Sequence, residues 1–256
     1  MFISSSLDVI SSIIGSMQEQ VAPLVEKSNL ISMVMSFMED NDDVVRQSAF
    51  SVLGDLAQHC FQSIRPHIKQ FVHLCVKYMN IEYPSVCNNT IWALGEMIVK
   101  DGEEIKVYAE AIFPMLISFI SQSRLPPGIR ENSTIVICRF CLFAPETVTL
   151  AKDYFGVLCV NVGKLSDGLE KQQSARGLCQ ILNKEPSVFP AAFPQFAVMV
   201  ASWSSISDLS LGQMLLNVLN AFKECMGANW QQYYEQNVDI RFRQIIFSNF
   251  NFNYIV

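Results

Sequence analysis

Apolar residues recur every three or four positions along nearly the whole chain, and sustained alternation of apolar and polar residues is almost absent. The first spacing is typical of amphipathic helices, whereas the second would indicate half-buried strands. Breaks between the apolar segments come at the distances expected of helix–turn–helix units. The pattern therefore predicts an all-α fold.

Five of the predicted helices resemble one another when they are placed in register. They cover residues 44–56, 85–97, 128–140, 170–182 and 210–222, and their starts are 41, 43, 42 and 40 residues apart. This spacing is typical of HEAT repeats, in which each unit is a pair of antiparallel helices. We therefore expect a right-handed superhelix, or solenoid, built from helix pairs of about 40 residues.

A second set of helices alternates with these five repeated helices. We call them partner helices, and they are predicted at residues 21–38, 66–78, 105–120, 147–162 and 189–203. Most contain or begin with a proline, which bends a helix axis; these are Pro23, Pro66, Pro114, Pro190 and Pro194. Such helices suit the convex side, which leaves the repeated helices on the concave side. Residues 7–18 would be the second helix of an incomplete first repeat, so one array is expected over residues 1–236.

The register also identifies side chains that point away from the apolar stripe of the repeated helices. At about 100° per residue, the eighth position lies roughly 140° from the centre of that stripe. It holds Trp92 and Ile135, while Asp55 and Glu96 occupy the twelfth position, one turn later. Asp8 leaves the apolar arc of its own helix in the same sense. We expect Trp92 and Ile135 side by side on the inner surface, flanked by carboxylates.

An exposed aromatic ring beside an aliphatic side chain and carboxylates suits an extended peptide with basic and apolar residues. The stems of Lys or Arg can lie on the ring while their charged ends meet the acids. The alternative is that Trp92 fills space between repeats and the acids form only a solvated surface.

Composition narrows the possible partners. Half of the 256 residues are hydrophobic, which is enough for a large core. The net charge of -6 argues against general binding to nucleic acids or anionic membranes and favours basic partners. Every window of about 18 residues contains a charge or a proline, and the first residues lack the features of a signal peptide. We therefore expect an intracellular protein without a membrane span.

Candidate chemistry is sparse. The eight cysteines lie in apolar runs, which favours reduced, buried thiols. Cys138 and Cys141 form a C-x-x-C motif, but it falls late in a predicted helix and no second ligand pair accompanies it. His59, His67 and His73 lie near Asp55 in sequence without a nucleophile motif, phosphate loop or metal spacing. We expect no catalytic site, metal or cofactor.

Two stretches carry a family resemblance. VRQSAF at 45–50 with LGDL at 53–56, and SVCNN at 85–89 with WALGE at 92–96, resemble the C-terminal part of the transportins. Transportins are nuclear import receptors of the beta-karyopherin superfamily. Supporting stretches lie at 131–132, 174–177, 201–203 and 229–230, so the resemblance covers about residues 4–236.

The resemblance implies a cargo receptor that shuttles between cytoplasm and nucleus. Such receptors bind nuclear localisation signals of the proline-tyrosine class, including those of RNA-binding proteins, and meet nucleoporins; direct binding to nucleic acid or membrane is not implied. The family's C-terminal arch receives the upstream basic or hydrophobic part of the signal. Its contacts would fall on Asp8, Asp55, Asn88, Trp92 and Ile135, with Pro84 where relatives offer an apolar contact.

The chain also departs from the family. It corresponds to roughly the last third of a transportin, so the main site for Ran-GTP, the acidic loop and the site for the proline-tyrosine end are expected to be absent. Residues 237–256 are rich in Asn and Phe, show no clear helical stripe, and are a candidate for disorder. The alternative function is a HEAT-repeat scaffold that binds folded protein partners without a role in transport.

Overall fold

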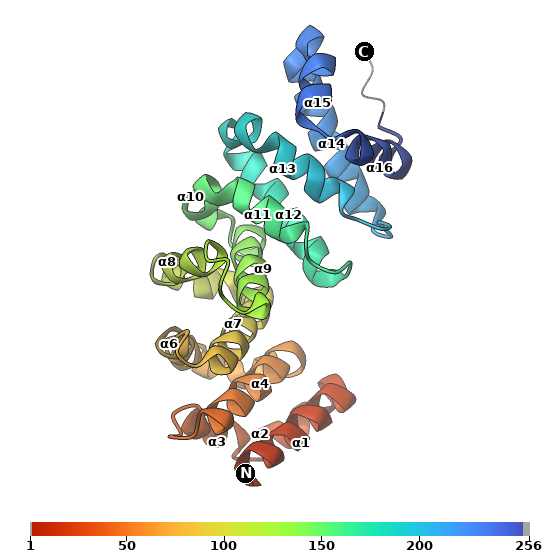
Figure 1. Cartoon of the computed structure of the whole chain (residues 1–256). Coiled ribbons are helices and arrows are strands. Elements are labelled where there is room, and N and C mark those ends of the chain that lie inside the picture. The colour runs from red at the N-terminus through yellow and green to blue at the C-terminus, as the bar shows by residue number, and fades with distance from the viewer. Residues whose placement is uncertain (1, 253–256) are drawn as a thin grey trace. The chain divides into compact units, whose positions relative to one another are not determined.

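The computed structural model describes residues 2–252, which contain helices and no strand (Figure 1). The described chain divides into two compact units, residues 1–136 and 137–256, and the division falls inside one helix. The all-α prediction is confirmed, and the single repeat array over 1–236 stays a prediction. The right-handed coiling of the whole array stays a prediction.

In unit 1 the repeated helices are α1, α4, α7 and the first part of α9, and they run Phe2–Met17, Asp43–His59, Pro84–Ile105 and Pro127–Phe143. Partner helices α3 (Leu30–Phe37), α6 (Ile68–Tyr78) and α8 (Ala109–Ile120) lie on one side of them (Figure 1). Two short helices, α2 (Ala22–Glu26) and α5 (Phe61–Ile64), complete the unit. The predicted partner helix at 21–38 is thus broken into α2 and α3.

Unit 2 contains the rest of α9 and seven further helices. These are α10 (Val148–Ala151), α11 (Phe155–Val162), α12 (Leu169–Lys184), α13 (Phe189–Ala201), α14 (Leu209–Met226), α15 (Trp230–Asn237) and α16 (Ile240–Phe250). Here α12 and α14 are repeated helices, while α11 and α13 are partner helices that pack against each other.

Local chemistry sets where several helices begin. The Asp42 carboxylate accepts the backbone N–H of Val44 at 3.0 Å, and Asp208 caps α14 through Leu211 N–H in the same way. Pro84 begins α7, where a missing N–H costs nothing. Pro114 and Pro194 lie inside α8 and α13.

The apolar stripe of the repeated helices is buried, as predicted. Residues at its ninth and thirteenth positions, such as Val52, Leu56, Ala93 and Met97, are fully inaccessible to solvent. One helix pair cannot cover this stripe alone, so each pair depends on its neighbour within the unit.

The described part of the C-terminal tail contains helix α16, Ile240–Phe250. Helix α16 packs against α13, with Ile246 fully buried. Asn249 Nδ2 donates a hydrogen bond to the backbone carbonyl of Trp203 at 3.2 Å. The Phe252 ring lies 6.1 Å from the Trp230 ring, inside an aromatic cluster. The sequence did not predict this helix because only one narrow side of it is buried, so its apolar positions form no clear stripe.

A buried cation holds the loop between α13 and α14. Lys171 is 1% exposed, and its Nζ lies 2.8 Å from Asp167 Oδ1, 3.1 Å from the Ser202 carbonyl and 4.6 Å from the Trp203 ring centroid. Asp167 also accepts hydrogen bonds from the backbone N–H and hydroxyl of Ser204. Partial burial opposes ionisation of Asp167, but the Lys171 and Ser204 hydrogen bonds outweigh it and lower its pKa to about 2.

This lowered pKa predicts an acid-sensitive contribution to the stability of unit 2. The contribution is present above the unfolded pKa of about 4 and is lost as the pH falls towards 2. Because Asp167 is partly exposed, we expect only about 1 kcal/mol. Urea unfolding should show a larger loss of stability for Asp167→Asn at pH 7 than at about pH 3, where roughly half of the contribution remains. Asp153→Asn, at an exposed position just before α11, should change little at either pH. An equal deficit at both pH values would contradict the role of the charge.

Seven of the eight cysteines are buried, and all eight are free. Burial raises the pKa of Cys141 and Cys179 to about 12, so these thiols stay protonated at neutral pH. No single helix among residues 2–252 is both long and apolar enough to cross a membrane; the one apolar pair of sufficient length, Pro127–Phe143 with Pro145–Val162, is bent by 117°.

Candidate peptide-binding surface of unit 1

Trp92 lies against the preceding repeated helix and does not stand free. A Cβ built on Gly54 of α4 would overlap the indole and come within 2.6 Å of its Cη2 atom. The ring therefore rests on a helix surface that only glycine can provide. Trp92 remains half-buried, so part of the indole is open to solvent.

Ile135 and Glu96 are not on the open surface that the sequence pattern predicts. Ile135 is 3% exposed and Glu96 is 6% exposed. For Ile135 the physical reason is the one seen at Trp92: a side chain in the eighth position is directed at the neighbouring repeated helix. The expected platform of Trp92 and Ile135 is therefore corrected to the exposed part of Trp92 alone.

Two carboxylates on neighbouring repeated helices remain accessible. Asp8 is exposed on α1, and Asp55 is half-buried on α4, directly after the glycine beneath the indole. The hydroxyl of Ser11 donates a hydrogen bond to Asp55 Oδ2. Since Ser11 follows Asp8 by three residues on one helix, both lie on the same side of α1.

The electrostatics at Asp55 favour an incoming cation. Burial raises the pKa of the Asp55 carboxyl above its ordinary value, and the charge of Glu96 raises it further, against the lowering effects of Ser11 and His59. The raised pKa means that nearby positive charge and hydrogen bonds do not compensate fully for the burial of the Asp55 carboxylate. A Lys or Arg side chain beside it would stabilise the ionised form.

Asn88 and the adjacent Asn89 link α7 to the two neighbouring repeated helices, α9 and α4. Asn132 Nδ2 on α9 donates to Asn88 Oδ1 at 3.1 Å, and Asn89 Nδ2 donates to the Gln47 carbonyl on α4 at 3.1 Å. The half-buried Asn88 amide is therefore partly used within the fold. Pro84 is exposed at the start of α7.

The histidines do not form a catalytic arrangement in the described chain. A cavity of about 340 Å³ contains His59 together with Glu19, Glu26 and Cys60, but neither of the other two histidines. Burial and the charge of Glu26 raise the pKa of the Cys60 thiol, which disfavours the nucleophilic thiolate.

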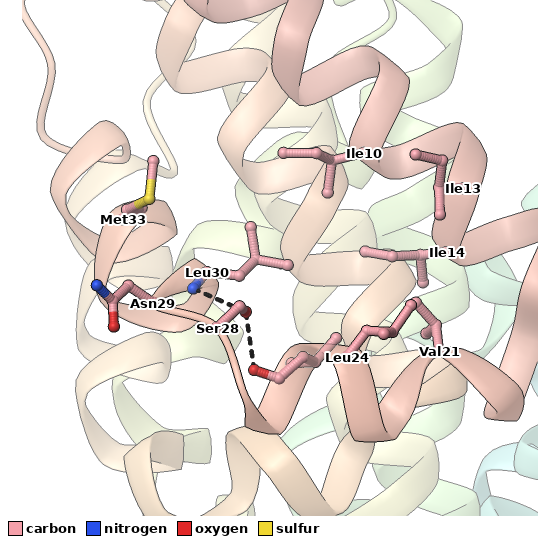
Figure 2. A pocket seen from close by; sticks show the side chains of 10 residues that line it. Ile10, Ile13, Ile14, Val21, Leu24, Ser28, Asn29, Leu30 and Met33 are labelled. Atoms are coloured by element: carbon pink, nitrogen blue, oxygen red, sulfur yellow. Dashed lines mark hydrogen bonds between the residues drawn. The ribbon is translucent and has the colours of Figure 1, made fainter.

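An apolar groove of about 320 Å³ lies elsewhere in unit 1, between α1, α2 and α3. Figure 2 shows Ile10, Ile13 and Ile14 of α1 facing Leu24 of α2 and Leu30 of α3 across it. Ser28 links α2 to α3 by donating to the Val25 carbonyl at 2.8 Å and accepting from Leu30 N–H. Leu24 remains 56% exposed.

Comparison with known proteins agrees with this architecture. The HEAT repeat family matches residues 30–60, which include α3 and α4. Transportin-1 of Mus musculus and of Homo sapiens is 31% identical over 237 residues, and transportin of Dictyostelium discoideum is 28% identical over 253 residues. The chain is similar to these transportins over most of its own length. The aligned region is 92% of this chain but 26% of either transportin-1, so the chain spans about a quarter of these curated relatives.

Solved structures support the fold of this chain. A crystal structure of importin beta aligns with a TM-score of 0.58 at 15% identity, covering 91% of this chain and 31% of that one. An engineered protein aligns with the same TM-score of 0.58 at 13% identity, over 88% of this chain and 96% of that one. At these identities the likeness concerns the fold alone.

The sequence pattern did not identify several residues that support the candidate surface. Ser11 could not be predicted, because nothing in the sequence indicates which side chain a serine on the polar side of a helix will bond to. Gly54 could have been found, because a glycine in the eleventh position lies opposite the large eighth-position side chain of the next repeat. Asn89 and Asn132 contact other helices through amides that the apolar pattern does not detect.

Proposed function

We propose that unit 1 is a cargo-binding segment of a nuclear import receptor, and that it binds the basic or hydrophobic part of proline-tyrosine nuclear localisation signals. The exposed part of the Trp92 indole is the apolar contact, and Asp8 and Asp55 accept basic side chains. The observation that carries the proposal is the position of Asp55, immediately after the glycine on which the indole rests. Homology to nuclear import receptors supports it independently.

We also propose other parts of the transport cycle on the strength of the similarity to transportins. Shuttling between cytoplasm and nucleus and contact with nucleoporins belong to the proposal, and Ran-GTP belongs to the longer relatives. Asn88 and Pro84 are proposed secondary contacts, since one is half-buried and the other exposed on α7. Ile135 and Glu96 support the surface from beneath, because both are buried.

The electrostatic part of the proposal predicts a pH-dependent affinity. A labelled 15-residue peptide that carries four arginines and two leucines should bind more weakly as the pH falls from about 7 to about 4, because Asp55 becomes neutral as the pH passes its raised pKa. Fluorescence anisotropy measures the affinity at each pH. The matched peptide with glutamines in place of arginines should bind weakly throughout.

Asp55→Asn is the matched variant for this titration. It keeps the shape and a hydrogen-bond acceptor for Ser11 but removes the titrating charge, so we expect a flatter pH profile and weaker binding at pH 7. Asp43→Asn, at the start of α4 and exposed, should leave the profile unchanged. A glutamine peptide that binds as tightly as the arginine peptide would contradict the proposed function.

The apolar groove between α1, α2 and α3 favours a second candidate function, a scaffold that holds a folded protein partner through a helix. The two functions use different surfaces of unit 1. Leu24→Asp, which places a charge in this groove, should abolish scaffold binding and leave the arginine peptide's affinity unchanged. Loss of peptide binding in this variant would contradict the assignment of the peptide to Trp92 and Asp55.

A further inference from the structure

Ser11 makes a contact that sets it apart from neighbouring serines of α1. The hydroxyls of Ser6 and Ser12 donate to backbone carbonyls four residues earlier in the same helix, at 2.8 and 2.9 Å. Such a carbonyl is a common partner of a serine within a helix. The Ser11 hydroxyl instead crosses to α4 and donates to Asp55 Oδ2. The bond joins residues 44 positions apart, so Asp55 is fixed from a different helix.

This hydrogen bond distinguishes the two oxygens of the Asp55 carboxylate. Helix α1 packs against α4, and Ser11 reaches Oδ2 from α1, so Oδ2 faces that helix. Asp55 is half-buried, and its Oδ1 has no hydrogen-bond partner within residues 2–252. A ligand that approaches from the open side therefore meets Asp55 mainly through Oδ1.

Few groups of the protein compensate the charge of Asp55. Burial has the largest effect and raises its pKa, while the Ser11 hydrogen bond lowers it. His59 on the same helix also lowers this pKa, and Glu96 on α7 raises it. Helix α1 carries Asp8 as its one ionisable side chain, and α3 carries none. The Ser11 hydroxyl is thus an uncharged group that favours the ionised form of Asp55.

We propose that Ser11 is a positioning residue of the site for basic side chains, and that it restricts Asp55 to a contact through one oxygen. Arginine gains most over lysine where its planar fork meets both oxygens of a carboxylate. An Asp55 with one oxygen held by α1 does not offer that pairing, whereas a lysine N–H needs a single acceptor. Asp55 should therefore accept lysine as readily as arginine. The inference rests on the function proposed for unit 1 and names the side chains that its segment can carry.

Ser11→Ala removes the hydroxyl and keeps the Cβ atom. Asp55 then loses a donor to its ionised form, so its pKa should rise by roughly one unit. Binding of a cation requires the ionised form and is lost as the pH falls through this pKa. The loss should therefore begin at a higher pH in Ser11→Ala. The released carboxylate can also turn both oxygens towards the open side, which favours arginine.

A titration of ¹³C-labelled aspartate carboxyls tests the hydrogen bond in the full chain without any peptide. Asp55→Asn identifies the resonance of Asp55. Its titration midpoint should be higher in Ser11→Ala than in the wild type, and Ser11→Thr, which keeps a hydroxyl, should restore it. His59 and Glu96 are present in the wild type and in both Ser11 variants, so their influence cancels in the comparison.

Ser12→Ala is the matched control for this titration. It removes a hydroxyl from the next position of α1, but the lost bond lies within that helix and does not touch Asp55. The Asp55 midpoint should therefore equal that of the wild type. An equal midpoint in Ser11→Ala and the wild type would overturn the inference.

Fluorescence anisotropy tests the choice between lysine and arginine. The probes are the peptide with four arginines and two leucines and the same peptide with lysines in place of arginines. At pH 7 the ratio of the two affinities should move about threefold towards arginine in Ser11→Ala and stay at the wild-type value in Ser11→Thr. Contacts of arginine with Trp92 are common to all variants and do not change this comparison.

An unchanged ratio in Ser11→Ala would overturn the single-oxygen contact. Failure of the wild type to bind either peptide would instead contradict the function proposed for unit 1. The carboxyl titration would in that case still decide whether Ser11 positions Asp55, because it needs no ligand.

Discussion

Gly177→Ala should lower the free energy of unfolding of unit 2 by about 3 kcal/mol, because there is no room for a methyl group between α12 and α9. A Cβ at Gly177 would overlap the Cys138 carbonyl oxygen and lie 2.8 Å from its carbonyl carbon. The obstacle is helix backbone, which cannot move aside as the end of a flexible side chain can. Urea unfolding followed by circular dichroism measures the loss.

Gly156→Ala is the matched control for this substitution. Gly156 also lies in a helix of unit 2, but its nearest obstacle would be the Ala192 side chain at 3.6 Å, an ordinary contact. Adding the methyl group should therefore be neutral or stabilise the helix by about 0.5 kcal/mol, as is usual for replacing a helical glycine. If Gly177→Ala and Gly156→Ala had equal stability, the close approach of α12 to α9 would be wrong.

Gly54→Ala should expel the Trp92 indole from its position on α4. The new methyl group would overlap the ring, and the side chain must rotate towards solvent to avoid it. We expect a loss of about 2 kcal/mol from the buried part of the ring and a red shift of tryptophan fluorescence. The shift is attributable to Trp92 because Trp203 and Trp230 are 3% and 0% exposed.

Gly15→Ala provides the control in unit 1. A Cβ at Gly15 of α1 has no atom within 4 Å, so neither stability nor emission should change by more than a small amount. Iodide quenching adds an independent measure, since an expelled indole becomes more accessible. Unchanged emission and quenching in Gly54→Ala would show that the indole does not rest on α4.

Helical periodicity was sufficient to predict the repeated helices, because stacking buries one continuous apolar stripe and selection of that stripe leaves a strong pattern. Val52, Leu56, Ala93 and Met97 follow it and are all buried. The division into two units left no such pattern, since it falls within the continuous helix α9.

The candidate site was only partly predictable for a geometric reason. An angle on a helical wheel shows that Trp92 and Ile135 leave the apolar stripe, but it does not show whether solvent or a neighbouring helix lies in that direction. The structure places the preceding repeated helix there, so Ile135 is buried and Trp92 half-buried. Asp8 and Asp55 stay accessible, because Asp8 is exposed and Asp55 is half-buried.

The tail shows a different limit of pattern analysis. Residues 240–250 form α16 although arginines, Gln244 and Ser248 interrupt its apolar positions, because burial of Ile246 and one hydrogen bond from Asn249 tie the helix to unit 2. Because so few residues of α16 make tertiary contacts, its other positions need not be apolar and the helix shows no clear apolar pattern.

The central claim is that the exposed edge of Trp92 and the Asp55 carboxylate bind a basic, extended segment together. Its most direct test is titration of the arginine-rich peptide against wild type, Trp92→Ala/Asp55→Ala, and a control, Val107→Ala/Glu110→Ala. Val107 lies in the turn just before partner helix α8 and Glu110 in its first turn, and both are exposed. We predict that the first pair weakens binding about 30-fold, as expected for a loss of about 2 kcal/mol, and that the control pair leaves it unchanged. Equal affinity of the wild type and the Trp92→Ala/Asp55→Ala variant would contradict the claim.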